Sequence, residues 1–470
     1  MPMCMLAQEY FTGCLINEEA YNALPQKKEN LTRDYEILPP SYSLKQYCPT
    51  PNNQSSYSTC TAWSSAYAAR TIAEAVAYGW KDKEKITQES FSPIYIYAKI
   101  KERDDNCQSG TYINKALEIM KNEGVAKYKS FDVKCASYTP YSLKEEAWQY
   151  KIDDYLTLFD SDSPYSIKVR ETKKAIYQDR PVIIGMKCYT SFSNATDIWN
   201  GRTDIDRGNH AMCVIAYDDN KNGGSFQLMN SWGLGWGNGG FTWVTYNDYY
   251  RCVREAYTIY VKKKELPKPQ PKPEPQPQPK PEPPPEPIKS VNLGGEIHYH
   301  LTAEGKKGDE MYVQIHSEKV IPYYRMEKGY ESGSRYRIYI SNNEPAYVYV
   351  IGSDLKNSVS LAFPLDDKTS ALIDKSSNIA IPDEKWSIEM DTTVGTDYVC
   401  VLYSESALPI HDIVKKVKEA SGNFYDKIKF ALSDDMIPTK ETNYSQNVIR
   451  FDVKGAKKTV VPVIVEIEHK

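Results

Sequence analysis

A proline-rich stretch in the middle of the chain limits its fold more than any other feature of the 470-residue sequence. Residues 266–289 read "LPKPQPKPEPQPQPKPEPPPEPIK", and proline occupies 12 of the 21 positions from 267 to 287. Proline has a fixed φ and no N–H to donate, and the intervening Lys, Glu and Gln cannot form a core. We therefore predict a polyproline II spacer of roughly 65 Å, at ~3.1 Å per residue. A ligand for an aromatic-grooved module is the alternative.

The two parts that flank this spacer differ in pattern. Residues 38–263 begin with helical periodicity and continue with strand-like segments, which is typical of an α+β domain. Residues 290–470 consist mostly of strand-like segments separated by turn residues, with one helix predicted at 410–423, and indicate a β-sandwich-like domain. Residues 1–37 are then an N-terminal extension, and residues 264–289 are the linker.

Charge and hydropathy argue against nucleic-acid binding and against a membrane-spanning segment. The formal net charge is −4 and no long basic block occurs, so we predict no nucleic-acid binding. No apolar run approaches the ~20 residues of a membrane span, so we predict no transmembrane segment.

The first nine residues, "MPMCMLAQE", look like the tail of a secretory signal whose beginning is missing. We therefore expect a secreted, periplasmic or cell-surface protein, with residues 1–37 as a signal remnant or a short pro-segment.

The stretch "TCTAWSSAYAARTIAEAVAYG" predicts a helix that begins at Cys60. Small residues recur at helical spacing from Ala62 to Ala77, and Gly79 is a typical stop. A cysteine at a helix start is either a small packing residue or a nucleophile. The positive end of a helix and a neighbouring imidazolium both stabilise a thiolate, which is the reactive form.

Only one of the six histidines, His210, precedes the linker, so it is the only imidazole available to Cys60 within that domain. Asn230 follows in "LMNSWGLGWGNGGF" and could orient the imidazole without adding charge. Gln54, six residues before the cysteine, could join the Cys60 backbone N–H in holding an oxyanion.

The order Gln54, Cys60, His210, Asn230, with "NSWGLGWG" around the asparagine, resembles the papain-like cysteine peptidases. The resemblance covers about residues 38–262. It implies a two-lobed fold, hydrolysis of peptide or protein substrates by a Cys-His-Asn thiolate mechanism with a glutamine-assisted oxyanion hole, and no metal or cofactor.

The resemblance also implies substrate-binding positions. Gly110 in "CQSG" would be a backbone partner for bound peptide, and Trp232 would shield the histidine–asparagine hydrogen bond. Gly208 and Ala211 would border the pocket for the residue one before the scissile one.

Three departures from the family pattern stand out. Tryptophan follows the nucleophile at position 63 instead of directly, and Tyr57 replaces the cysteine that would pair with Cys107, whose partner therefore stays unassigned. "LPPSYSLKQYCP" resembles the start of a mature peptidase domain. Fewer than forty residues precede it, so we expect that any latency does not depend on a large folded pro-domain, and that trimming to Leu38 brings no large gain in activity.

The C-terminal half resembles an uncharacterised β-domain family that accompanies bacterial peptidases, through "YRIYISNNEPAYVYVIGSDLKNSVSLAFPLDD" and "IPDEKWSIEMDTTVGTDYVCVLYSES". It could bind a surface, the substrate or a partner protein. His298 and His300 share one face of a strand and His316 lies on another. Such spacing permits metal binding, but exposed strand histidines are commoner, and we predict no metal site.

Two other functions remain open at this point. A transglutaminase-like arrangement would perform acyl transfer or amidase chemistry, although it usually has an acidic third residue. A catalytically silent binding protein on a peptidase scaffold would leave the β-domain as the working part. We expect a monomer in each case.

Overall fold

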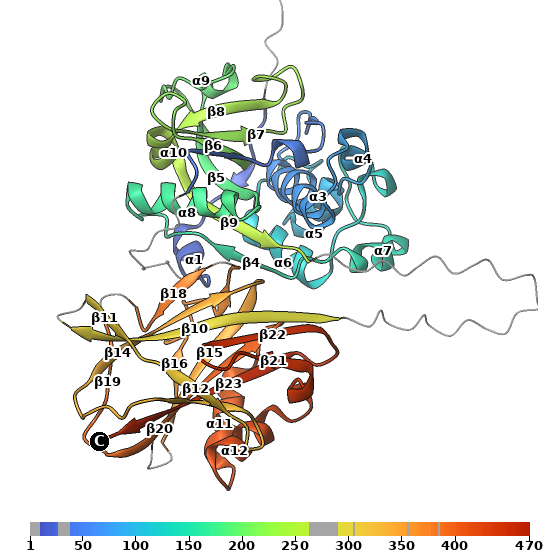
Figure 1. Ribbon diagram of the computed structural model, residues 1–470. Coiled ribbons are helices and arrows are strands. Elements are labelled where there is room, and N and C mark those ends of the chain that lie inside the picture. Colours follow the sequence, from blue (N-terminus) through green and yellow to red (C-terminus); the bar gives the residue numbers. More distant parts are fainter. Residues whose placement is uncertain are drawn as a thin grey trace, which may run out of the picture. The chain divides into compact units, whose positions relative to one another are not determined.

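The chain is described by a computed structural model that covers residues 10–26, 38–262, 290–303, 306–354, 358–375, 377–383 and 386–470 (Figure 1). The described residues form two compact units, the first from 10–26 and 38–262 and the second from 290–470. The stretch "MPMCMLAQE" and the predicted spacer lie outside the described residues. Within the described residues, no helix combines the length and apolar character needed to cross a bilayer.

The helix predicted from Cys60 runs through three consecutive segments: α2 (Cys60–Ala62), the π-helical η2 (Trp63–Arg70) and α3 (Thr71–Tyr78). It ends at Gly79, whose φ of +66° is a left-handed conformation that glycine adopts without strain. The small-residue face is buried as expected. The helices that follow along the chain are α4 (Lys83–Gln88), α5 (Pro93–Ile100), α6 (Ile113–Asn122) and α7 (Lys144–Gln149).

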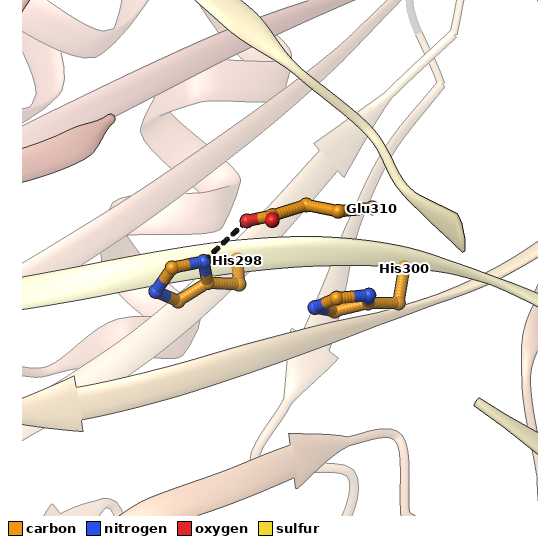
Figure 2. Close-up of side chains that lie close together, drawn as sticks. All are labelled: His298, His300 and Glu310. Carbon is orange, nitrogen blue, oxygen red and sulfur yellow. Dashed lines mark hydrogen bonds and ion pairs between the residues drawn. The ribbon is translucent and has the colours of Figure 1, made fainter. Parts of the chain in front are cut away.

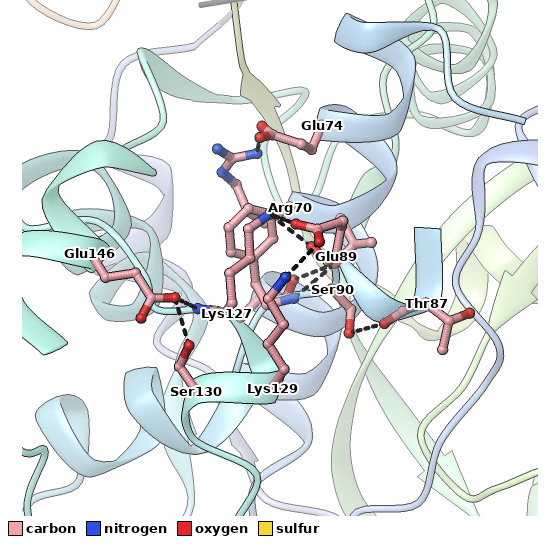
Figure 3. Close-up of polar contacts among 12 residues, drawn as sticks. Arg70, Glu74, Thr87, Glu89, Ser90, Lys127, Lys129, Ser130 and Glu146 are labelled. Atoms are coloured by element: carbon pink, nitrogen blue, oxygen red, sulfur yellow. Dashed lines mark hydrogen bonds and ion pairs between the residues drawn. The ribbon is translucent and has the colours of Figure 1, made fainter. Parts of the chain in front are cut away.

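A buried group of charged side chains joins these helices (Figure 3). Arg70 Nη1 lies 2.6 Å from Glu74 Oε2, and both side chains are almost fully buried. Lys127 Nζ donates to the backbone carbonyl of Glu89 at 2.9 Å and lies 4.0 Å from the ring centre of Phe91. The guanidinium of Arg70 lies 4.4 Å from the same ring centre, so Phe91 links the loop at Lys127 to the long helix that begins at Cys60.

The other part of the first unit is an antiparallel sheet in the order β4-β9-β5-β6-β7-β8, with β2 paired to β6. The strand-like segments expected in the later part of residues 38–263 are confirmed, and β6 begins four residues before His210. The strand bounds are β2 (Ser41–Ser43), β4 (Asp154–Thr157), β5 (Val182–Tyr189), β6 (Asp206–Asp218), β7 (Ser225–Met229), β8 (Phe241–Thr245) and β9 (Val253–Tyr260).

The unit also contains a small two-stranded pair and further helices. An N-terminal strand, β1, pairs in parallel with β3. The remaining elements are β1 (Cys14–Leu15), α1 (Glu18–Asn22), β3 (Thr111–Tyr112), α8 (Tyr165–Tyr177), α9 (Thr190–Ser193) and α10 (Tyr246–Cys252). Helices and sheet share one core, which gives the α+β class that the sequence predicted.

The second unit contains two sheets that share one hydrophobic core, to which Ile297 and Ile338 of one sheet and Val348 and Val401 of the other contribute. The first sheet contains β10 (Val291–Ala303), β11 (Lys306–Glu310), β14 (Arg335–Asn342), β18 (Asn378–Ile381), β19 (Ile388–Glu389), β21 (Thr442–Tyr444) and β22 (Ile449–Ala456). The second contains β12 (Val313–His316), β13 (Tyr323–Met326), β15 (Ala346–Ser353), β16 (Val359–Phe363), β17 (Leu372–Ile373), β20 (Gly395–Ser404) and β23 (Val460–His469).

The prediction of a single helix in this unit was incomplete. The predicted segment forms α11 (Ile410–Glu419), and a second helix, α12 (Phe424–Leu432), follows it. Asn423 caps α12 by accepting a hydrogen bond from the backbone N–H of Asp426. The residue that ends the predicted helical stretch therefore starts the next helix.

Candidate active site

Cys60 lies at the first position of its helix, fully buried against β6. Burial raises the pKa of the Cys60 thiol to about 11, whereas hydrogen bonds from the backbone N–H of Ala211 and from Thr61 act in the opposite direction. Ala211 directly follows His210 on β6. The fold therefore brings the cysteine and the histidine segment together from positions 150 residues apart in the chain.

The side chain of His210 is held by Asn230, whose Oδ1 lies 2.8 Å from His210 Nε2. The same Oδ1 accepts the backbone N–H of Ser231 at 2.7 Å, and a backbone N–H only donates, so the amide oxygen must face this side. His210 Nε2 consequently carries the proton, and Nδ1 keeps the lone pair. His210 Nδ1 makes no hydrogen bond among the described residues. The arrangement thus leaves an unprotonated nitrogen that can accept a proton.

Trp232 covers the histidine–asparagine pair. Its ring stacks on His210 with centroids 4.5 Å apart, and Trp236 meets it edge-on at 5.4 Å. Burial lowers the pKa of His210 to about 4, although the hydrogen bond with Asn230 raises it. Both the thiol and the imidazole are therefore neutral in this state of the protein.

Gln54 is linked through Ser231 to the loop that carries Asn230 and Trp232. Its Oε1 accepts the Ser231 hydroxyl at 2.6 Å, and its backbone N–H donates to the Ser231 carbonyl at 2.8 Å. Gln54 Nε2 donates to the carbonyl oxygens of Tyr57 at 2.7 Å and Phe11 at 3.1 Å. Sequence reasoning missed Ser231, although it lies inside the quoted "NSWG" motif.

Residues 10–15, which we call the cap segment, lie across this site. The Phe11 carbonyl oxygen accepts hydrogen bonds from Gln54 Nε2 and, at 2.9 Å, from Trp232 Nε1. Tyr10 stacks on Trp232 with ring centroids 4.7 Å apart. Further along, Gly13 accepts the Thr111 backbone N–H at 2.9 Å and donates its own N–H to the Asn209 carbonyl at 3.3 Å. The sequence suggested a short pro-segment within residues 1–37 as one possibility, but no local pattern indicated which residues contact the site.

Of the three small residues singled out as substrate-binding positions, Gly110 and Gly208 lie against the cap segment, and Ala211 lies against Cys60. A Cβ on Gly110 would come 2.8 Å from the Gly13 carbonyl oxygen, and one on Gly208 would come 3.8 Å from Thr12 Oγ1. Ala211 is fully buried, with its N–H directed at the Cys60 sulfur. The backbone hydrogen bond on this side comes from Thr111 instead of Gly110.

The structure assigns the cysteine that the sequence left without a partner. Cys107 is bonded to Cys135, with their Cα atoms 5.9 Å apart. The Cys107 carbonyl accepts the backbone N–H of Ser58 at 2.9 Å, so the disulfide-bonded loop supports the turn before Cys60. The displaced Trp63 is buried in the π-helical segment and packs on Tyr67.

Two families match separate parts of the chain. Residues 42–262 match the papain family cysteine protease, and residues 329–407 match a domain of unknown function, DUF4384. Part of the β-rich C-terminal region is therefore similar to an uncharacterised domain family, as the sequence suggested.

Individual relatives are distant. An uncharacterized peptidase C1-like protein of Acanthamoeba polyphaga mimivirus is 24% identical over 203 residues, covering 40% of this chain and 62% of the relative. A cysteine protease of Blomia tropicalis is 24% identical over 242 residues, covering 48% and 66%. The chain thus spans just under two thirds of each. The crystal structure of xylellain, a cysteine protease from Xylella fastidiosa, has 19% identity and a TM-score of 0.43, covering 53% of this chain and 96% of that one.

Proposed function

Residues 42–262 are a papain family cysteine protease domain, and from this premise we propose that the protein hydrolyses peptide bonds with Cys60 as nucleophile. The observation that carries the proposal is the hydrogen bond of His210 Nε2 with Asn230 Oδ1. It leaves the Nδ1 lone pair free to take a proton on the strand that lies against the Cys60 sulfur. Peptide or protein chains are the substrates, and the reaction uses no cofactor.

The proposed reaction begins when the Cys60 thiol transfers its proton to His210 Nδ1. The thiolate attacks the peptide carbonyl, and the oxyanion accepts hydrogen bonds from Gln54 Nε2 and the Cys60 backbone N–H. The intermediate collapses as His210 protonates the leaving amine, which leaves a thioester on Cys60. His210 then removes a proton from water, the hydroxide attacks the thioester, and the acid product leaves as the thiol is restored.

Asn230 and Trp232 act through the histidine in this scheme. The asparagine holds the imidazole with Nδ1 unprotonated, and the stacked indole keeps water from their hydrogen bond. Gly110, Gly208 and Ala211 border the space that a substrate would occupy in place of the cap segment.

The cap segment acts as a short pro-segment in this proposal. The Phe11 carbonyl engages the Gln54 Nε2 donor that the oxyanion requires, so the segment must leave before substrate binds. Latency would then depend on a few residues, without a large folded pro-domain. Contrary to the sequence-based expectation, however, trimming to Leu38 should increase activity.

Covalent labelling with an epoxide-type thiol inhibitor tests the nucleophile. We expect stoichiometric labelling of the trimmed protein and loss of labelling in Cys60→Ala, with Cys252→Ala as a control that removes another buried thiol. Labelling that persists in Cys60→Ala would contradict the proposal. Mass spectrometry of the products then distinguishes hydrolysis from acyl transfer, and unlabelled, inactive protein would favour the silent binding scaffold.

We also propose that the protein works as a monomer outside the cytoplasm and that residues 290–470 bind a surface, a substrate or a partner. The Cys107–Cys135 bond supports the location, because structural disulfides persist in oxidising compartments. Removing residues 263–470 should leave cleavage of short peptides unchanged and weaken cleavage of the natural target. Equal loss of both activities would contradict a binding role.

A further inference from the structure

Two histidines and a glutamate converge on one face of the β10–β11 hairpin in the second unit (Figure 2). His298 and His300 lie two residues apart on β10 and therefore share a face of the strand. Glu310, the last residue of β11, pairs directly opposite His300. One ligand atom from each of the three lies within 4.8 Å of the others. The histidines alone gave no reason to predict a metal site, because exposed strand histidines are common, and Glu310 joins them only through strand pairing.

The hydrogen bonds of His300 determine which nitrogen is available. Its Nδ1 lies 3.3 Å from the Gly308 carbonyl, and a carbonyl only accepts, so Nδ1 carries the proton. The lone pair of His300 is then on Nε2. A metal-ligating histidine usually donates its second ring N–H to an oxygen acceptor in this way.

In His298 the nitrogen that faces an orienting acceptor is Nε2, whereas in His300 it is Nδ1. Its Nε2 lies 2.7 Å from Glu296 Oε1, and Arg450 Nε donates to the other oxygen of that carboxylate at 2.8 Å. Because Arg450 and His298 Nε2 both lie against the Glu296 carboxylate, which accepts, the lone pair of a neutral His298 imidazole is on Nδ1. That Nδ1 lies 2.6 Å from Glu310 Oε1, so two acceptors face each other unless a cation or a further proton lies between them.

We propose that His298 Nδ1, His300 Nε2 and the Glu310 carboxylate bind a divalent transition-metal ion of the Zn²⁺ class. Two neutral imidazoles and one carboxylate are a recognised three-ligand set for Zn²⁺, with water in a fourth position. All three side chains are partly exposed, so an ion can enter from solvent. Among the described strands β11 pairs only with β10, and the ion fastens it to the sheet.

Metal titration of the full chain tests the site. All measurements use the Cys60→Ala protein as background, or carrier, because this substitution removes the proposed nucleophile as a competing ligand and prevents self-cleavage. We expect Co²⁺ to bind with one saturable site that shows d–d absorption without a thiolate charge-transfer band, and Zn²⁺ to displace it. Glu310→Gln and His300→Gln should each weaken binding at least tenfold. Glu296→Gln, which alters only the orienting carboxylate, should weaken it about 10–100-fold.

His316→Gln is the matched control, because His316 lies on β12 in the other sheet and stacks on Tyr323. It should leave the affinity unchanged. Circular dichroism checks that each variant folds, and the thermal shift that Zn²⁺ produces in the carrier gives a second readout that should vanish in Glu310→Gln. Absence of saturable binding, a thiolate band, or an equal loss in His316→Gln would each overturn the proposal.

Discussion

The Phe11 carbonyl oxygen lies 3.1 Å from Gln54 Nε2, and the two residues are 43 positions apart in the chain. The same oxygen also accepts the Trp232 indole N–H. A segment of the protein's own backbone thus takes up the donors that line the candidate active site. Cys60 and His210 are both fully buried, and this burial raises the pKa of the thiol and lowers the pKa of the imidazole.

Gly13→Ala should activate the full-length protein. A Cβ on Gly13 would collide with the Ser58 backbone carbonyl, and overpacking of this kind costs about 1–3 kcal/mol, so the cap segment should dissociate more often. We expect turnover of a fluorogenic peptide to rise roughly tenfold or more. Gly235→Ala is the control, since a Cβ there meets no atom within 4 Å. Unchanged activity in Gly13→Ala would count against the cap.

Alkylation of Cys60 should depend on pH differently with and without the cap. In the full-length protein the thiol has its pKa raised to about 11 by burial, so the iodoacetamide rate should climb toward that pH. In Gly13→Ala, water reaches the sulfur and the helix start stabilises the thiolate, so the rate should level off below the ordinary thiol pKa. Peptide mass spectrometry from pH 6 to pH 11 measures both profiles. Coincident profiles would show that the cap does not control the thiol.

Ser231→Ala should reduce kcat more than it changes KM. The hydroxyl holds the Gln54 amide by donating to Oε1, and loss of one such bond costs about 0.5–1.5 kcal/mol, roughly 2–12-fold in rate. Gln54→Ala, which removes the donor itself, should cost about 10²–10³-fold. Ser225→Ala removes another buried serine hydroxyl on β7 and should have no kinetic effect. Steady-state kinetics on Gly13→Ala background protein measures all three, and an effect on KM alone would contradict a positioning role.

Lys127 should make stability rise with pH in an alkaline window. Burial lowers its pKa from 10.5 to about 8, so between these values the unfolded chain binds a proton that the folded protein does not. The free energy of unfolding should therefore increase from pH 8 to pH 10.5, by up to about 3 kcal/mol from this residue. Lys127→Met keeps the apolar stem over Phe91 and should lose this slope. Urea unfolding of both proteins across the window gives the difference, and parallel slopes would refute it.

Reduction of the Cys107–Cys135 bond should destabilise the first unit. It closes a loop with a sequence separation of 28 residues, for which chain entropy gives about 3.5 kcal/mol. The loop also supports Ser58, so we expect KM to rise in Cys135→Ser. Thermal unfolding with and without reductant measures the loss of stability that reduction causes. A Cys400→Ser variant, which lacks a free thiol of the other unit, should respond to reductant like the unmodified protein.

Features that depend on local sequence were predictable. The helix from Cys60 to Gly79 follows from small-residue spacing and a glycine stop. The order of Gln54, Cys60, His210 and Asn230 indicated the chemistry, because each residue type has a defined role in it. The second C-terminal helix was missed since Asn423 looked like the end of one helix and is the cap of the next.

Tertiary structure decided everything that depends on chain closure over long distances. The cap segment over Gln54, the Cys107–Cys135 pair and the placement of Glu310 opposite His300 each join residues whose separation no local pattern encodes. Strand register and loop closure set these contacts, and a shift of one residue in β11 would turn Glu310 to the other face. The sequence by itself determined which groups could react, and the fold determined which of them are covered, oriented or brought together.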